Sequence, residues 1–413
     1  MTPDMKGFLL VSVLKMLVVF TITMVGVALL TLMERKVSAW MQNRRGPNRV
    51  GWAGLLQPAA DGVKNILKEE TFPALANRSL FILAPAMSFI PALLLFGVIP
   101  FAAPLPLEFD FTLGPLGRFT HHGVMPMVVA DLPIGFLFVL AISSLGVYGI
   151  ALAGWSSNSK YALLGGLRAS AQMISYEVAM GLSLIPVLLM SGNVSLSAIV
   201  ARQQAGLWYV MPLFLSFFIF LISGFAETNR LPFDLPEAES ELIAGYHTEY
   251  SAMKFSFFFI AEYANVVTVC AMVTTLFFGG WDIPGAWDEQ GGVLQTVVTA
   301  GFFFLKVMFW IFVVMWIRWT LPRFRYDQLM ALGWKVLMPL ALAYIMVVCT
   351  AIYLIERVGG VTNPRLESFI LFGVNLVVGV LVFRILDSGT FIKGSGRRRD
   401  VGVPAAARPA VAG

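Results

Sequence analysis

Nine separate stretches of this chain stay apolar for about 20 residues, the length at which an α-helix crosses the hydrocarbon core of a bilayer. The composition agrees, because 58% of the residues are hydrophobic and only 13% are charged. The sequence therefore predicts an all-α polytopic membrane protein rather than a soluble domain. The expected spans lie near residues 7–33, 80–101, 124–152, 162–190, 208–227, 251–279, 294–319, 335–355 and 367–386.

Basic residues predict the orientation of these spans. An odd number of spans places the two termini on opposite sides of the membrane. With the N-terminus outside, the inside loops and tail hold 22 of the 29 Lys and Arg residues, and the outside segments hold five. Lys15 and Lys306 lie within spans. Because positive residues accumulate on the cytoplasmic side, we expect a cytoplasmic C-terminus. We also expect one membrane domain over residues 1–390 and a basic, disordered tail over 391–413.

A charged segment follows the first span and has helical periodicity. In residues 52–68, apolar side chains recur on one face, whereas Gln57, Asp61, Lys64 and Lys68 fall on another. The predicted amphipathic helix is too short and too charged to span the bilayer. It either lies on the membrane surface or lines a cavity with its polar stripe.

Residues that hold redox cofactors are scarce. The two cysteines, Cys270 and Cys349, are far apart in sequence, and the three histidines do not form a pair within a span. Neither a P-loop nor a GxGxxG fingerprint is present. We therefore expect no metal and no redox cofactor in this chain, so that any electrons arrive from another subunit.

Carboxylates are concentrated in one connecting segment, the acidic loop at residues 228–250. The stretch ETNRLPFDLPEAESELIAGYHTEY, which starts at Glu227, holds six acidic residues. An exposed loop is one interpretation. However, apolar residues such as Phe233 and Tyr246 are interleaved with the acids, and they favour a loop folded against protein. Closely spaced carboxylates there raise one another's pKa and can exchange protons near neutral pH.

Two further acids lie inside predicted spans. Glu262 is roughly 16 Å along its helix at 1.5 Å per residue, and Glu177 is well within the fourth span. An ionised acid facing lipid costs a few kcal/mol, so both acids are expected to face protein or a wet cavity. They are either structural hydrogen-bonded acids or parts of a proton relay with Glu227 and the loop acids. Ser170, Gln172, Ser175 and Tyr176 add polar groups around Glu177.

Four segments of the sequence resemble a known family. They are MERKVSAWMQNRRGPNRVGWAGLLQPAADGVKNILKEE, RASAQMISYEVAMG, AETNRLPFDLPEAESELIAGYHTEYSAMKF and WIRWTLPRFRYDQLMALGWKVLMP. Together they look like the H subunit of respiratory NADH:quinone oxidoreductase (complex I), called subunit 1 in mitochondria, from about Gly7 to Tyr353. The resemblance implies an eight-helix subunit of the bacterial plasma membrane that joins the peripheral redox arm to the proton-pumping membrane arm. The ninth span and the basic tail depart from that pattern.

The resemblance also implies a substrate, partners and site residues. A quinone, either ubiquinone or menaquinone, would bind in a channel formed largely by this subunit, next to a partner that carries iron–sulfur clusters. Flavin and NADH would bind in the peripheral arm. The implied quinone-channel residues are Glu34, Arg35, Arg44, Asp61, Arg230, Phe233, Asp234, Glu237, Glu239 and Arg318. The implied proton-path residues are Glu177, Glu227, Glu241, Glu249, Glu262 and Tyr263.

Basic residues after the seventh span have two interpretations. Arg318, Arg323 and Arg325 lie where cytoplasmic positive charge is expected in any case. They could in addition hold the acidic loop through ion pairs, which are stronger when partly desolvated.

Two other functions remain compatible with the residues. One is the homologous membrane subunit of an energy-converting hydrogenase, which lacks the quinone. The other is an independent proton-coupled secondary transporter, a class that often has internal repeats, which this sequence does not display.

Overall fold

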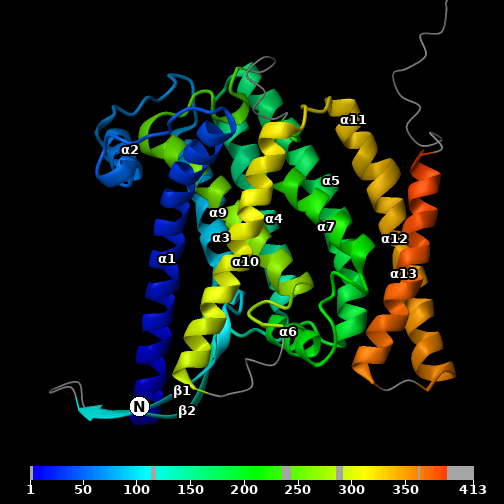
Figure 1. Cartoon of the computed structure of the whole chain (residues 1–413). Helices are drawn as coiled ribbons and strands as arrows, with labels where there is room; N and C mark the ends of the chain where they lie inside the picture. Colours follow the sequence, from blue (N-terminus) through cyan, green and yellow to red (C-terminus); the bar gives the residue numbers. More distant parts are fainter. Residues whose placement is uncertain (1–2, 113–117, 235–242, 285–291, 361–362, 388–413) are drawn as a thin grey trace, which may run out of the picture.

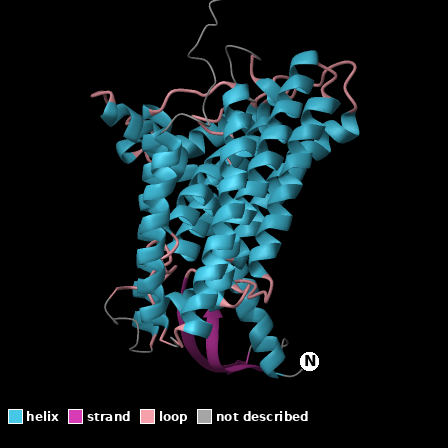
Figure 2. Ribbon diagram, turned by 90° about the vertical axis from the view of Figure 1, so that its right-hand side faces the viewer, coloured by secondary structure: helices cyan, strands magenta, loops and turns pink. Residues whose placement is uncertain are grey.

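Long helices whose axes are roughly aligned dominate the computed structural model (Figures 1 and 2). The structure describes residues 3–112, 118–234, 243–284, 292–360 and 363–387. The N-terminus lies at one end of the bundle, and the last helix finishes at the other end (Figure 1). The elements are α1 (Pro3–Met41), η1 (Trp52–Gly54), α2 (Gln57–Leu67), α3 (Arg78–Leu95), η2 (Phe96–Val98), β1 (Ala102–Thr112), β2 (Arg118–Met127), α4 (Gly135–Ser156), α5 (Lys160–Ser191), α6 (Leu196–Ala205), α7 (Phe214–Glu227), η4 (Gly245–His247), α9 (Ala252–Phe277), α10 (Val293–Thr320), α11 (Tyr326–Ala331), η5 (Leu332–Leu337), α12 (Met338–Tyr353), η6 (Leu354–Val358) and α13 (Pro364–Asp387).

Within the described residues, eight helices are long and apolar enough to cross a membrane. This confirms the prediction of a mostly helical, multi-span protein, and it includes the C-terminal helix α13. The span expected near 208–227 corresponds to α7, which has 14 residues and is shorter than the others. Residues 209–213 instead form turns, in which the Val210 N–H donates to the carbonyl of Phe277.

A β-hairpin, which was not predicted from the sequence, lies at the end of the bundle that holds the N-terminus (Figure 2). Strands β1 and β2 pair antiparallel, with Thr112 opposite Arg118 and Leu105 opposite Met125. The expected start of the third span at residue 124 was therefore wrong, because α4 begins at Gly135. The sequence between residues 124 and 134 contains Pro126 and Pro133, which are compatible with a strand and a turn but unfavourable within a helix.

Lys15 and Lys306, which lie deep within apolar spans, are held by backbone carbonyls. The Lys15 ammonium donates to the carbonyls of Pro126 and Val128 at 3.1 and 3.0 Å, at the end of the hairpin. The Lys306 ammonium donates to the carbonyls of Phe278, Gly280 and Asp282 at 2.6–3.0 Å. These bonds engage two of the three N–H donors of Lys15 and all three of Lys306, which reduces the penalty for placing each charge within an apolar span.

Small residues let the central helices approach closely near the acidic loop. A Cβ atom on Gly154 of α4 would lie 3.2 Å from the Gly166 Cα of α5. One residue earlier on α5, a Cβ on Gly165 would lie 2.7 Å from the backbone of Gly245. Interfaces of this kind bring helix backbones together in membranes. They fix the returning end of the loop, at η4, against α5.

Candidate functional site

Glu34 is the centre of a buried group of charges. It lies in the last third of α1 and is only 5% exposed. Its Oε2 accepts hydrogen bonds from the Tyr263 hydroxyl at 2.6 Å and from the Arg230 guanidinium at 3.1 Å. Its Oε1 accepts from Arg318. Helices α1, α9 and α10 and the segment after α7 thus converge on one carboxylate.

Arg230 links this carboxylate to a second one. Its Nε lies 2.6 Å from Oε1 of Glu262, and its guanidinium lies 3.9 Å above the ring of Tyr263. Burial alone lowers the pKa of the Arg230 guanidinium, but Glu262, Tyr263 and Glu34 outweigh it and raise the pKa above its ordinary value. Arg230 therefore stays charged. Two guanidinium groups balance two carboxylates, and we name Glu34, Arg230, Glu262, Tyr263 and Arg318 the Glu34 cluster.

A pocket of about 390 Å³ lies between α1, α2 and α9 and shares Tyr263 with this cluster. Met24, Val27 and Phe259 give it apolar walls. The polar stripe of α2 lines part of it, as one of the two interpretations of this helix predicts. Here Arg35 lies 2.8 Å from Asp61, whose other oxygen accepts from the Gln57 amide at 3.1 Å. Tyr263 belongs both to the pocket wall and to the cluster.

The start of the acidic loop is folded against protein. The ring of Phe233 packs between those of Tyr176 and Phe324, each at a centroid distance of 5.6 Å. Asp234 pairs with Arg323 at 3.1 Å. The interpretation of an exposed loop is therefore wrong for this part, and one basic residue after the seventh span holds the loop as proposed. Arg318 instead pairs with Glu34.

A fully buried amide fixes the same segment to α5. The Gln172 Nε2 donates to the carbonyls of Ala226 and Phe233 at 2.9 and 2.8 Å and to the Asn229 side chain at 3.2 Å. Both ends of the 226–233 segment therefore bond to one side chain. Gln172 sets the distance between α5 and the residues that flank Arg230.

Polar groups continue from the cluster into the bundle. Glu227 is 9% exposed and lines two small cavities of about 30 Å³ each. One cavity is also lined by Glu262 and Asn265, and the other by Ser143 and Asn265. Each is large enough for a water molecule with several polar partners. Ser143 lies 3.5 Å from Oε1 of Glu177. Acidic groups thus follow one another from Glu262 through Glu227 to Glu177.

Most of the described candidate residues meet in this region. Arg35 and Asp61 line the pocket, and Glu34, Arg230, Glu262, Tyr263 and Arg318 form the Glu34 cluster. Phe233 and Asp234 follow Arg230 in the chain and contact Phe324 and Arg323. Tyr263, assigned from the resemblance to the proton path, bonds directly to Glu34 at the pocket. Arg44 is exposed and bonds to Gln42, and Glu249 is half-buried in the returning loop. Glu237, Glu239 and Glu241 lie outside the described residues.

Several residues of this region were not predicted as site residues from the sequence. Ser143 and Asn265 line the small cavities, and Lys254 pairs with Glu70 at 2.7 Å beside the ring of Phe72. A spacing of three residues from Glu262 to Asn265 and on to Thr268 marks a polar stripe on an apolar helix and could have been recognised. Ser143 gives no comparable signal, because single serines are common in membrane helices.

The fold and this site define a multi-pass membrane protein with a buried ionic cluster beside an apolar pocket. Residues 14–349 match the family described as NADH dehydrogenase. The chain is 52% identical over 353 residues to the second H-type NADH-quinone oxidoreductase subunit of Koribacter versatilis, covering 82% of this chain and 96% of the relative. It is 52% identical over 342 residues to the second such protein of Geobacter metallireducens (83% and 95% covered) and 49% identical over 339 residues to that of Leptospira biflexa (81% and 92% covered). The chain belongs to this family as the H-type membrane subunit of NADH-quinone oxidoreductase.

Proposed function

We propose that the pocket between α1, α2 and α9 binds the quinone, and that the Glu34 cluster couples its reduction to proton movement. The observation that carries the proposal is the position of Tyr263. Its side chain lines the pocket and donates to Glu34, which Arg230 and Arg318 also contact. A quinone headgroup at the inner end of the pocket would therefore meet a hydroxyl, two guanidinium groups and a carboxylate.

The chemistry of quinone reduction suits this arrangement. The apolar walls at Met24, Val27 and Phe259 accommodate an isoprenoid tail, and the polar end takes the headgroup. Reduction to quinol requires two electrons and two protons. The electrons come from an iron–sulfur cluster of a partner subunit, which receives them from NADH through flavin. A proton donated from Tyr263 or its neighbours to a quinone oxygen leaves a negative charge beside Arg230 and Arg318.

That charge gives a route from chemistry to transport. Arg230 contacts both Glu34 and Glu262. Added negative charge beside Glu34 attracts the Arg230 guanidinium and weakens its ion pair with Glu262. A released Glu262 can take up a proton and exchange it, through water in the two small cavities, with Glu227 and then Glu177. The loop acids Glu237, Glu239, Glu241 and Glu249 would supply protons from the cytoplasmic side.

The placement in the cell follows from the same proposal. The Glu34 cluster would face the cytoplasm, where the peripheral arm docks, and the N-terminus would lie outside. The basic residues of the cytoplasmic segments support this orientation. The exposed side of α2, with Ile66 and Leu67, would rest on the membrane surface beside the pocket mouth.

Tyr263→Phe tests the proposal in the assembled enzyme. The substitution removes one hydroxyl and leaves the ring under Arg230 in place. We predict that NADH:quinone reductase activity falls by roughly 100-fold, the lower end for a positioned acid–base group, while NADH:ferricyanide reductase activity is retained. The matched control is Tyr148→Phe, at an exposed tyrosine on α4. Unchanged quinone reduction in Tyr263→Phe, with normal assembly, would contradict the proposed site.

A further inference from the structure

A large cavity lies at the end of the bundle opposite the Glu34 cluster and takes no part in the proposed reaction. It measures about 820 Å³ and is formed by α6, the turns before α7, the loop after α9 and the start of α13. Helix α6 lies at the end of the bundle opposite α2 (Figure 1). Helix α7 begins nearby at Phe214, α9 ends at Phe277 and α13 begins at Pro364. The cavity thus lies where the apolar helices end, at the level of the membrane surface.

The base of this cavity is rigid. The Gln203 side chain is 1% exposed, donates to the Thr275 carbonyl at 2.9 Å and accepts from the Tyr209 and Gly279 N–H groups at 3.2 and 3.0 Å. The Trp208 indole donates to Asp282 at 2.7 Å. The Lys306 ammonium lies 4.2 Å from the centre of the Trp208 ring. The cavity is therefore preformed.

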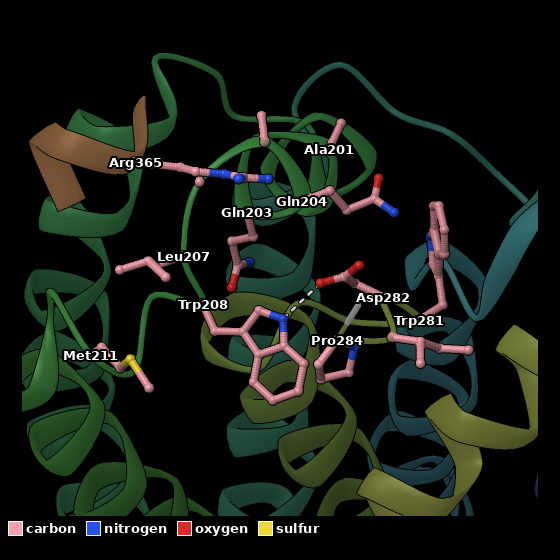
Figure 3. A pocket seen from close by; sticks show the side chains of 13 residues that line it. Ala201, Gln203, Gln204, Leu207, Trp208, Met211, Trp281, Asp282, Pro284 and Arg365 are labelled. Carbon is pink, nitrogen blue, oxygen red and sulfur yellow. Dashed lines mark hydrogen bonds between the residues drawn. The ribbon is translucent and has the colours of Figure 1, made fainter. Parts of the chain in front are cut away.

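The wall of the cavity combines one exposed cation with aromatic and apolar groups. In Figure 3, Arg365 reaches in from α13, Trp281 stands on the opposite side, and Trp208 and Asp282 lie between them. Leu207 and Met211 form an apolar side. Arg365 has no ion-pair partner within the described part of the chain. The carboxylate of Asp282 is already engaged by the Trp208 indole.

These features match the parts of one ligand. An arginine fork binds phosphate oxygens, indoles favour the level of lipid headgroups, and a volume of this size exceeds what a free ion needs. An apolar side that ends among exposed Phe214 and Met211 continues toward the lipid-facing surface. We propose that this cavity binds an anionic phospholipid of the adjacent leaflet, with its phosphodiester on Arg365 and its acyl chains along Leu207 and Met211.

Photolabelling of the assembled enzyme tests the proposal. The probes are phosphatidylglycerol and phosphatidylcholine that carry a photoactivatable group in one acyl chain, in nanodiscs of otherwise identical composition. We expect phosphatidylglycerol to label residues 201–211 and 281–284 preferentially. Arg365→Gln should reduce that labelling by about fivefold, the effect of one cation at a membrane surface. The control Arg357→Gln changes an exposed arginine near the same face and should leave labelling unchanged. Excess glycerol phosphate should not compete if the ligand is a lipid.

A second variant keeps the test decisive if Arg365→Gln assembles poorly. Ala205→Trp adds an indole at the cavity wall and should block labelling without removing a charge. Equal labelling by both lipids, insensitive to both substitutions, would overturn the proposal. So would cross-linking of a cysteine at position 205 to another subunit with no lipid labelling, since a protein would then fill the cavity. Displacement by glycerol phosphate would identify a soluble phosphate site instead.

Discussion

At the scale of single residues, the site depends on contacts between positions far apart in the chain. Glu34 meets Arg230 across 196 residues and Arg318 across 284 residues. The resemblance named all three as channel residues, but sequence alone could not pair them, because each contact depends on how distant helices pack. Removing one partner from a buried ion pair typically costs about 3–5 kcal/mol. A neutral substitution beside the cluster is therefore a cleaner probe than deletion of Glu34.

Gln172 offers such a probe. Gln172→Leu nearly keeps the volume but leaves two carbonyls and the Asn229 amide oxygen without their donor, at about 1–3 kcal/mol for each unsatisfied group. We predict that the 226–233 segment loosens and that quinone reductase activity falls about tenfold, the rate equivalent of about 1.4 kcal/mol. Ferricyanide reduction should persist. Gln295→Leu on α10 is the control. Normal activity and thermal stability in Gln172→Leu would show that this amide does not position the loop.

At the scale of elements, hydropathy predicted the long helices because apolar length is the requirement for crossing a bilayer. It failed at the hairpin, because the apolar end of β2, from Val124 to Met127, and the connecting residues after it were counted into the next span. It also cannot indicate how the added C-terminal helix attaches. The family match ends at residue 349, before α13 begins at Pro364. Helix α13 is held by a polar seam: Asn375 bonds to Tyr344 and to the Pro212 carbonyl, and Glu367 pairs with Arg202 at 3.2 Å.

Loss of this seam should release α13 without affecting the chemistry. In a membrane, a single interhelical hydrogen bond contributes about 0.6–1.7 kcal/mol, and Asn375→Leu removes two. We predict about tenfold faster trypsin cleavage at Arg365 in the detergent-solubilised enzyme, with quinone reductase activity unchanged. Val377→Leu, at a 65% exposed position of the same helix, should behave as wild type. Equal cleavage rates in both variants would mean that apolar packing alone holds α13.

At the scale of the whole molecule, the two ends of the bundle have different proposed roles. The Glu34 cluster and the 390 Å³ pocket lie toward one end of the bundle, and the 820 Å³ cavity with Arg365 lies at the other end. Between these ends, Glu262 of α9, Glu227 of α7 and Glu177 of α5 follow one another in space. The sequence supplied these acids individually. Their order along a path required the structure, because the linking groups Ser143 and Asn265 carry no charge.

We propose that this path carries protons whose movement is driven by quinone reduction. The most direct test of this proposal is the number of protons pumped per NADH oxidised in proteoliposomes that contain the assembled enzyme with Glu227→Gln. Gln nearly keeps the shape of Glu227 but cannot exchange a proton between the two small cavities. We predict that this ratio falls well below that of the wild type while quinone reduction continues, and that Glu108→Gln in the hairpin leaves both unchanged. An unaltered ratio in Glu227→Gln, in a fully assembled enzyme, would contradict it.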